Sequence, residues 1–468
     1  MTKLEKAWIS YDLGNSAFAT TVLAAFFPLF FPEFWGKDLT SVQSASYLLW
    51  TVALSNFLLF ISAPVIGALT DINGSTKKIF ITFTTIAIIC VGVLFFTKAG
   101  MWVSALVFFG VANYFFSAGN ILYDKILVKI TSPDRYSKIS GIGYAWGYFG
   151  GGLLFLINSV MFMFWESLWF ENSAEAILFA FLTVSIWWSI FLLPLAINYK
   201  DEKIVQDQIQ RNIIAESFKK TYSTIKSISE NKKIFLFLLA FFLYIDGVHT
   251  VMSSAVLYAK LLNLDDSAII VGLLIVQFVA FPFTLIWAYV AEKYNDKLVI
   301  NLSILIYIGV IFFSLTLSNA IEFYILAALV GSVQGGIQAS SRSFFATIIP
   351  AERSGEFFGF FNMFGKAGAF IGPTLVGVAL SPDNIQLGLL PVILLFVFGG
   401  IVLFKVSMKL FSKKSIIFYS VLGAITAFII APLIRSFLDY SVTVELLITT
   451  AIIIPMYAVI TRLARKYL

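Results

Sequence analysis

Asp246 lies about twelve residues into a long apolar run, where a charged side chain is costly to bury. His249, Thr250 and Ser253 follow at spacings of three, four and seven residues, so a helix would carry all four side chains on one face. This set could bind a small polar ligand or a coupling ion. Structural roles stay open for both residues: Asp246 could cap a kink at Gly247 or pair with another helix, and His249, the only histidine, could be a hydrogen-bonded packing residue.

Lys366 is a basic residue at similar depth, about nine residues into a later apolar run, with Asn362 one turn before it. A lysine there could hold an anionic group of a ligand or neutralise a buried acid such as Asp246. Reaching a lipid headgroup from this depth would strain the side chain. We therefore expect Lys366 and Asp246 to face one water-filled space.

Two further apolar runs each carry a polar stripe at helical spacing. The first stripe comprises Asn113, Ser117, Asn120 and Asp124. The second comprises Gln334, Gln338, Ser341 and Arg342. Such stripes avoid lipid, so we expect them to line a cavity, with hydrogen bonding between helices as the alternative. Asp124 and Arg342 end their stripes and could close the cavity as an ion pair.

Asp12 lies close to the start of the first apolar run, and Asn15 shares its helical face. We expect Asn15 to line the cavity, and Asp12 to lie in the cavity floor or in a gate below it. The alternative for Asp12 is a carboxylate stabilised by the positive end of a helix dipole.

Only membrane-spanning helices can position these residues. Hydrophobic residues make up 59% of the 468 and charged residues 12%, against about 45–50% and about 25% in soluble domains. A helix needs about 20 apolar residues to cross a bilayer. Fourteen runs meet this length, at approximately 8–32, 46–70, 79–97, 101–123, 140–164, 176–198, 234–259, 268–291, 298–318, 323–341, 357–380, 386–404, 416–434 and 442–461. The fold class is therefore all-α integral membrane.

Basic residues are distributed unevenly over the loops between these runs. With a cytoplasmic N-terminus, the opposite face would hold only Lys37, Lys98, Lys260 and Arg435. The positive-inside rule therefore predicts a multi-pass protein with both termini in the cytoplasm. The net charge of +6 indicates contact with anionic lipid and not with nucleic acid.

The first twelve runs form two similar sets of six, separated by the polar segment Tyr199–Lys233. An offset of 218 residues places Asn120 on Gln338 and Asp124 on Arg342. Apolar residues recur at helical spacing within the polar segment and predict an amphipathic surface helix. We expect an N-terminal six-helix bundle at 1–198, a cytoplasmic linker at 199–233, a second bundle at 234–404 and an additional transmembrane hairpin at 405–468.

Two loops share an acid at a helix end, a turn residue three positions later and lysines beyond it. The loop after the second run contains Gly67, Asp71, Gly74, Lys77 and Lys78, and the loop after the eighth contains Glu292, Lys293 and Asn295. The first loop resembles the signature loop of the major facilitator superfamily. In that superfamily such loops latch the outward-open state through charge pairs and helix dipoles.

The chain is similar to the vacuole-effluxer-like branch of that superfamily, whose fungal members export amino acids from the vacuole. The resembling segments are Tyr11–Thr20, Gly141–Gly152, Tyr244–Thr250, Gly335–Ser343, Glu356–Gly359 and Gly372–Pro373. The likeness covers about residues 8–404. The basic cluster after Gly74 lacks arginine, and the last two runs are additional to the usual twelve.

This resemblance implies a secondary transporter with the major facilitator fold that works by alternating access. It implies efflux of small organic solutes, with neutral amino acids as one substrate class and protons as a coupling ion that the sequence leaves open. A proton-coupled multidrug exporter is one alternative. A membrane sensor or scaffold that transports nothing is another.

An enzyme is not expected. The sequence has no Ser/His/Asp grouping at plausible reach, no metal-ligand spacing and no nucleotide motif, and Cys90 is the only cysteine. We therefore expect no catalytic residues, metal or cofactor. We expect a monomer in the inner or plasma membrane of a bacterium, or in a vacuolar-type membrane of a fungus.

Overall fold

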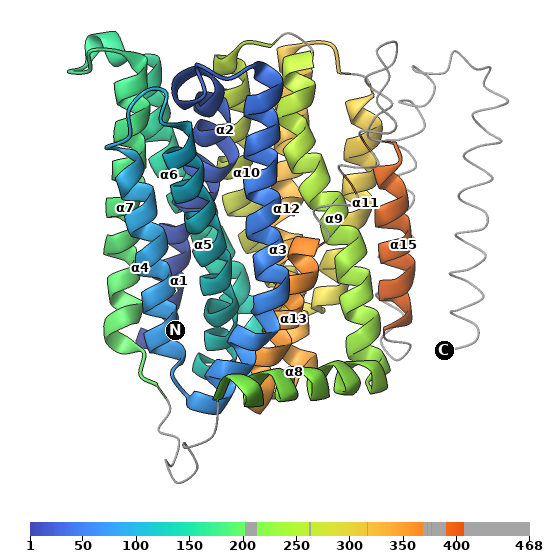
Figure 1. Ribbon diagram of the computed structural model, residues 1–468. Helices are drawn as coiled ribbons and strands as arrows, with labels where there is room; N and C mark the ends of the chain where they lie inside the picture. Colours follow the sequence, from blue (N-terminus) through green and yellow to red (C-terminus); the bar gives the residue numbers. More distant parts are fainter. Residues whose placement is uncertain are drawn as a thin grey trace, which may run out of the picture.

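Long helices that run nearly parallel to one another make up the structure (Figure 1). The computed structural model describes residues 1–201, 213–261, 264–315, 317–367, 372, 376 and 390–406. Ten described helical segments are long and apolar enough to cross a membrane, and they match the first ten predicted runs in order. The predicted runs 416–434 and 442–461, and with them the C-terminal hairpin, lie outside the described residues.

The first half of the chain provides six of these segments. The first segment is α1 (Lys3–Ala17), followed without a break by the π-helical η1 (Phe18–Phe26), α2 (Phe27–Phe30) and the π-helical η2 (Phe31–Trp35). The others are α3 (Ser41–Asn73), α4 (Thr76–Leu94), α5 (Trp102–Ile130), α6 (Tyr136–Met163) and α7 (Ser173–Asn198). Short 3-10 turns, η3 (Pro133–Arg135) and η4 (Trp165–Ser167), flank α6.

The second half provides the remaining segments. They are α9 (Lys232–Leu261), α10 (Asp266–Lys293), α11 (Asp296–Ser314) and α12 (Ala320–Ile348). The turn η5 (Ala351–Arg353) then leads into α13 (Ser354–Ala367), and α15 (Val392–Lys405) follows. The predicted runs 357–380 and 386–404 are thus described in part, by α13 and α15.

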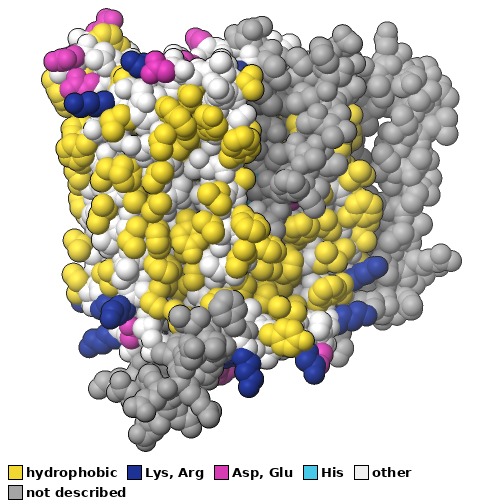
Figure 2. Space-filling model, viewed as in Figure 1, with side chains coloured by type: hydrophobic (Ala, Val, Ile, Leu, Met, Phe, Trp, Pro, Cys, Tyr) yellow, Lys and Arg dark blue, Asp and Glu magenta, His cyan; other side chains and the backbone are white. Residues whose placement is uncertain are grey.

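One helix does not run with the others. α8 (Ile213–Glu230) lies across the ends of the spanning helices, against α3, α13 and α9 (Figure 1). The N-terminus lies toward this same end of the molecule, which we call the linker end. Hydrophobic side chains cover the middle of the described surface, and most Lys and Arg side chains in this view lie at the linker end (Figure 2).

Polar side chains begin many of the helices, because the first amides of a helix have no partner inside it. Thr2 and Thr40 form capping boxes with Glu5 and Gln43. Among the later helices, single N-caps are provided by Asn172, Asp265, Asn295 and Asn319.

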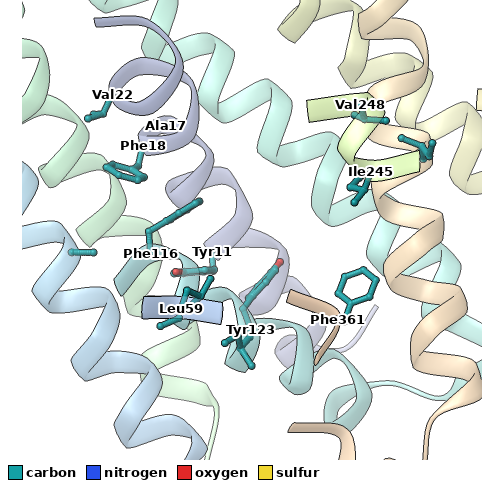
Figure 3. Packing of buried hydrophobic residues seen from close by; sticks show 14 of the residues in the cluster. Tyr11, Ala17, Phe18, Val22, Leu59, Phe116, Tyr123, Ile245, Val248 and Phe361 are labelled. Carbon is teal, nitrogen blue, oxygen red and sulfur yellow. The ribbon is translucent and has the colours of Figure 1, made fainter. Parts of the chain in front are cut away.

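Aromatic side chains pack within each half. Trp8 stacks on Tyr123 with ring centroids 4.3 Å apart, and Phe241 stacks on Phe361 at 4.0 Å. Figure 3 shows buried hydrophobic residues from both halves. Those of the first half include Tyr11, Phe18, Phe116 and Tyr123, and those of the second half include Ile245, Val248 and Phe361.

The halves meet mainly where α3 packs on α13 and where α6 packs on α10 and α12. Small residues allow these helices to approach closely. A Cβ atom on Gly141 of α6 would lie 2.3 Å from the Cβ of Ala288 in α10. A Cβ atom on Gly359 of α13 would lie 2.5 Å from the carbonyl oxygen of Ala63 in α3. These interfaces therefore have no room for larger residues.

Candidate functional site

Arg342 of α12 extends from the second half into a buried space in the first half. Its Nη1 lies 3.4 Å from Asp124 Oδ1, and its Nη2 lies 3.6 Å from Asp12 Oδ2. Its Nε and Nη2 also donate to the hydroxyl and carbonyl oxygens of Ser140, at 2.9 and 3.1 Å. The predicted pair of Asp124 and Arg342 is present, and it is extended by a second acid and by Ser140.

Aromatic rings of the first half enclose the same guanidinium. Its central carbon lies 4.7 Å from the Trp8 ring centroid, 4.3 Å from that of Tyr144 and 5.4 Å from that of Tyr123. Trp8 and Tyr123 are fixed by reciprocal hydrogen bonds between side chain and backbone, at 2.9 and 3.1 Å. The Arg342 side chain is only 3% exposed, so water screens these contacts little.

Two residues predicted for the substrate cavity belong to this group. Asn362 of α13 donates to Asp124 Oδ2 at 3.1 Å, and so reaches the first half from the second. Asp12, which was predicted to lie either in the cavity floor or in a gate below it, contacts Arg342. We call the whole group the Arg342 cluster: Trp8, Asp12, Tyr123, Asp124, Ser140, Tyr144, Arg342 and Asn362.

Asp71, in the last turn of α3, joins the halves at a second point. Its Oδ1 lies 2.8 Å from Lys125 Nζ of α5. Its two carboxylate oxygens accept the backbone N–H groups of Gly355 and Glu356, at 3.2 and 2.9 Å. These amides start α13, so one half supplies the negative cap of a helix in the other. We call Asp71, Lys125, Gly355 and Glu356 the Asp71 cluster.

Gly67, one turn before Asp71, makes this approach possible. A Cβ atom there would lie 2.0 Å from the carbonyl oxygen of Gly355, so any side chain would separate α3 from α13. Gly74 ends α3 with φ of 63°, the left-handed conformation that glycine adopts without strain.

The two lysines of this loop contribute backbone contacts. The backbone N–H groups of Lys77 and Lys78 donate to the carboxylate of Asp201 and so cap the start of α4. Within the described part of the chain, neither lysine side chain forms an ion pair. The charge partner of Asp71 is Lys125, which the sequence did not single out because it lies in α5, far from the loop.

The corresponding loop of the second half also reaches across. Glu292 of α10 lies 3.1 Å from Lys138 of α6, but both side chains are more than one-third exposed, so the pair contributes little. Lys293 instead lies over the rings of Tyr289 and Tyr294, at 5.7 and 5.6 Å from their centroids. The predicted acid therefore contacts the other half, whereas the predicted lysine does not.

Asp296, which the sequence analysis did not single out, contacts the first half at a more buried position than Glu292 does. Its Oδ2 accepts hydrogen bonds from the hydroxyls of Ser137 in α6 and Ser343 in α12, each at 2.9 Å. Only 7% of the residue is exposed. An acid directly after Asn295 looks like a helix-capping residue, and nothing in the sequence indicates its serine partners.

Both polar stripes form hydrogen bonds with other helices. Asn15 Nδ2 donates to Asn120 Oδ1 at 3.2 Å within the first half. Between the halves, the Tyr148 hydroxyl donates to Gln338 Oε1 at 3.1 Å. The stripes are therefore turned toward protein and not toward lipid, as their periodicity predicts.

Two amides of the stripes keep free acceptors. Asn113 Oδ1 and Gln334 Oε1 are buried and have no hydrogen-bond partner in the described part of the protein. An unpaired buried acceptor is costly, so a ligand or water would stabilise both sites.

Asp246 lies at the middle of α9 and is fully buried. Its Oδ2 accepts the backbone N–H of Gly372 at 2.8 Å, while its Oδ1 has no partner among the described residues. Thr250 donates to the backbone carbonyl of Asp246 at 2.7 Å. One carboxylate oxygen therefore binds the backbone at Gly372 and not at Gly247, and the other has no partner among the described residues.

Lys366 and His249 lie on the inner side of the second half. Lys366 is twelve residues past the start of α13, which is about 18 Å along the helix and near the middle of a bilayer. Both side chains keep partial exposure, and they lie close enough to interact electrostatically. None of the described carboxylates forms an ion pair with Lys366.

A metal centre has no support in the described ranges, which contain no group of three or more His, Cys, Asp or Glu side chains placed to hold an ion. The described polar groups near mid-span are instead amides, hydroxyls, the imidazole of His249, the ammonium of Lys366 and the carboxylate of Asp246. Such groups can bind a small polar solute by hydrogen bonds and one ion pair.

Known proteins resemble this chain in both sequence and structure. The family model described as vacuole effluxer Atg22-like matches residues 2–415. The MFS-type transporter YxiO of Bacillus subtilis, which is named as uncharacterized, is 34% identical over 406 residues, covering 86% of this chain and 94% of YxiO. Autophagy-related protein 22 of Kluyveromyces lactis is 24% identical over 374 residues, covering 72% of this chain and 74% of that protein.

A solved structure shares the arrangement of helices. The major facilitator superfamily transporter FucP, crystallised in the outward conformation, superposes with a TM-score of 0.62 at 13% sequence identity. The match covers 86% of this chain and 98% of FucP. At this identity the likeness concerns the fold.

Proposed function

Since this chain belongs to the Atg22-like vacuole effluxer family and has the major facilitator fold, we propose that it exports small organic solutes by alternating access. Family membership makes it a multi-pass membrane protein and a secondary transporter. The solute class and the residues that bind it are the parts that we propose.

The ammonium of Lys366, which has no ion-pair partner among the described residues, carries this proposal. A buried or half-buried charge without a partner is unfavourable, and at mid-span it is usually retained for a ligand or an ion path. Lys366 is therefore matched by a solute with a carboxylate, which would neutralise it on binding. Asn120 and Gln338, which belong to the polar stripes of the two halves, would supply amide groups for the rest of the solute.

A zwitterion such as a neutral amino acid fits these groups best. Its carboxylate would pair with Lys366, and its ammonium would bind Oδ1 of Asp246, which has no partner among the described residues, after a local movement at Gly372. The family resemblance favours the same class of solute. Organic cations, the substrates of a multidrug exporter, would be repelled by Lys366.

The two interfacial clusters account for access from one side at a time. Both close the linker end, because Arg342 and Asp71 each join helices of opposite halves. We infer that the linker end faces the cytoplasm, since basic side chains gather there. Separation of both clusters would open the site to the cytoplasm, and their closure would leave access from the opposite end. A sensor or scaffold would not require contacts between the halves that can form and separate.

Flux measurements in proteoliposomes test the proposal. Exchange of radiolabelled neutral amino acids is expected for the unaltered protein and is expected to be lost in Lys366→Met. Lys98→Met, which removes a lysine at the opposite end, serves as the matched control and should keep its flux. Absence of flux for every neutral amino acid would overturn the solute class, and equal flux in both variants would overturn the role of Lys366.

A further inference from the structure

α8 bonds directly to the Asp71 cluster. Lys220 Nζ of α8 lies 3.0 Å from Glu356 Oε1, and the hydroxyl of Thr224 donates to Glu356 Oε2. Arg353 also lies 3.0 Å from Glu356 Oε2. Glu356 is fully buried, and its backbone N–H is one of the two that Asp71 accepts. The position of α8 is therefore tied to the contact between α3 and α13.

α8 is continuous with the second half and lies across the first. Asn231 alone separates its last residue, Glu230, from the first residue of α9, Lys232. Asn231 Oδ1 accepts the N–H of Ile234 at 3.3 Å, which makes this corner a capped helix start. From there α8 extends over the end of α3. Separation of the halves at the linker end would therefore pull α8 away from α3.

The rest of α8 has two exposed faces of different character. Tyr222 and Ile225, three residues apart, are 74% and 51% exposed. Lys219 and Lys226, two turns apart, are exposed on the next face, where Lys226 lies 4.0 Å from Glu230. In Figure 2 the hydrophobic surface of the spanning helices continues down to the region of α8, with Lys and Arg side chains below it.

We propose that these exposed faces of α8 bind the anionic lipid headgroups of the leaflet at the linker end, and that this binding holds the linker end closed. Apolar side chains at the boundary of acyl chains and headgroups, with lysines beside them, are the pattern of a helix that lies in the membrane interface. Lys232 and Lys233, both exposed at the start of α9, extend the basic surface. The described basic residues of this surface outnumber Glu230, so acidic phospholipid is favoured over neutral lipid.

The consequence for the gate follows from the two attachments of α8. One face binds Glu356 in the Asp71 cluster, and the other faces bind a fixed lipid plane. Lipid that holds α8 in place also holds Glu356 and α3 in their closed arrangement. The inference relies on the proposed function only for the assignment of the linker end to the acidic, cytoplasmic leaflet.

The position of α8 is tested by single nitroxide labels in a Cys90→Ala background. Ile225→Cys and Ser223→Cys lie on the apolar and the charged face, and the full chain is placed in vesicles of phosphatidylcholine and phosphatidylglycerol in equal amounts. We expect the label at 225 to collide more with oxygen, which dissolves in lipid, and the label at 223 more with a water-soluble nickel complex. Equal and high nickel collision at both positions would overturn the lipid contact.

The effect on the gate is tested by the distance between nitroxides at Lys6→Cys and Glu352→Cys, both exposed at the linker end on opposite halves. In vesicles with phosphatidylglycerol we expect one short distance, and in phosphatidylcholine alone a longer one should appear. Lys219→Gln with Lys226→Gln should lower the ratio of closed to open protein about fivefold per lysine. Lys37→Gln with Lys98→Gln, exposed at the opposite end, is the matched control and should leave the ratio unchanged.

An identical distance distribution in both lipids would overturn the inference. A lipid-dependent distance without amino-acid flux would leave the inference standing and would contradict the proposed function instead.

Discussion

Replacement of Arg342 by glutamine tests whether the Arg342 cluster closes the linker end. The guanidinium is 3% exposed and contacts two carboxylates that are each 9% exposed. Removing one member of a buried ion pair costs roughly 3–5 kcal/mol, because the other member remains buried without a counter-charge. Here Asp12 and Asp124 would be left together in a space lined by Trp8 and Tyr144.

This cost falls on one conformation and not on the fold. Arg342 belongs to the second half and its acidic partners to the first, so under the proposed alternating access the contacts would exist only while the linker end is closed. When the halves separate there, water reaches both acids. Arg342→Gln should therefore lower the ratio of closed to open protein by roughly 10²- to 10⁴-fold.

The nitroxide pair at Lys6→Cys and Glu352→Cys measures this ratio. A matched control is Arg135→Gln, because Arg135 lies 2.8 Å from Glu5 within the first half. This substitution also removes an arginine–carboxylate pair, but it leaves the interface between the halves unchanged. A long distance is expected in Arg342→Gln and a short one in Arg135→Gln. If Arg342→Gln kept the short distance of the unaltered protein, the assignment of the cluster as a gate would be wrong.

Three further outcomes follow from described contacts. Gly67→Ala should hold the linker end open and abolish flux, because its Cβ would meet the backbone of Gly355, whereas Gly309→Ala, with no atom within 4 Å of the added Cβ, should behave as the unaltered protein in both assays. Asp71→Asn should raise the open fraction by about 10-fold or more, since it removes a charge that accepts two helix-start amides and pairs with Lys125, and the same nitroxide distance reports it. Arg135→Gln should lower the midpoint of thermal unfolding, by an amount corresponding to about 1 kcal/mol, because Glu5 is buried while Arg135 is partly exposed; an unchanged midpoint would contradict this.

The spanning helices could be predicted from the sequence because apolar length is a local property. The ends of the first ten runs agree with the described helical segments to within seven residues. The ion pair of Asp124 and Arg342 was also accessible, since the internal repeat places the two residues at equivalent positions of the halves.

Partners that meet only across the fold were not accessible. Asp71 stands out in the sequence, but Lys125 and the amides of Gly355 and Glu356 approach it from two other helices. The neighbouring Lys77 and Lys78 were the nearest charges in sequence, and their backbone caps α4 instead. Charge and spacing along the chain therefore identify which residue needs a partner, while the packing of the halves decides which partner it receives.

The cap that Asp71 supplies to α13 has a consequence for assembly. If the two halves were synthesised as separate polypeptides, the second would begin α13 with bare amides and the first would carry an acid with no helix start to cap. Two copies of the same half would satisfy neither need. The cap therefore favours the pairing of a first half with a second half in the bilayer. Co-expressed fragments should complement each other, while either fragment alone is degraded.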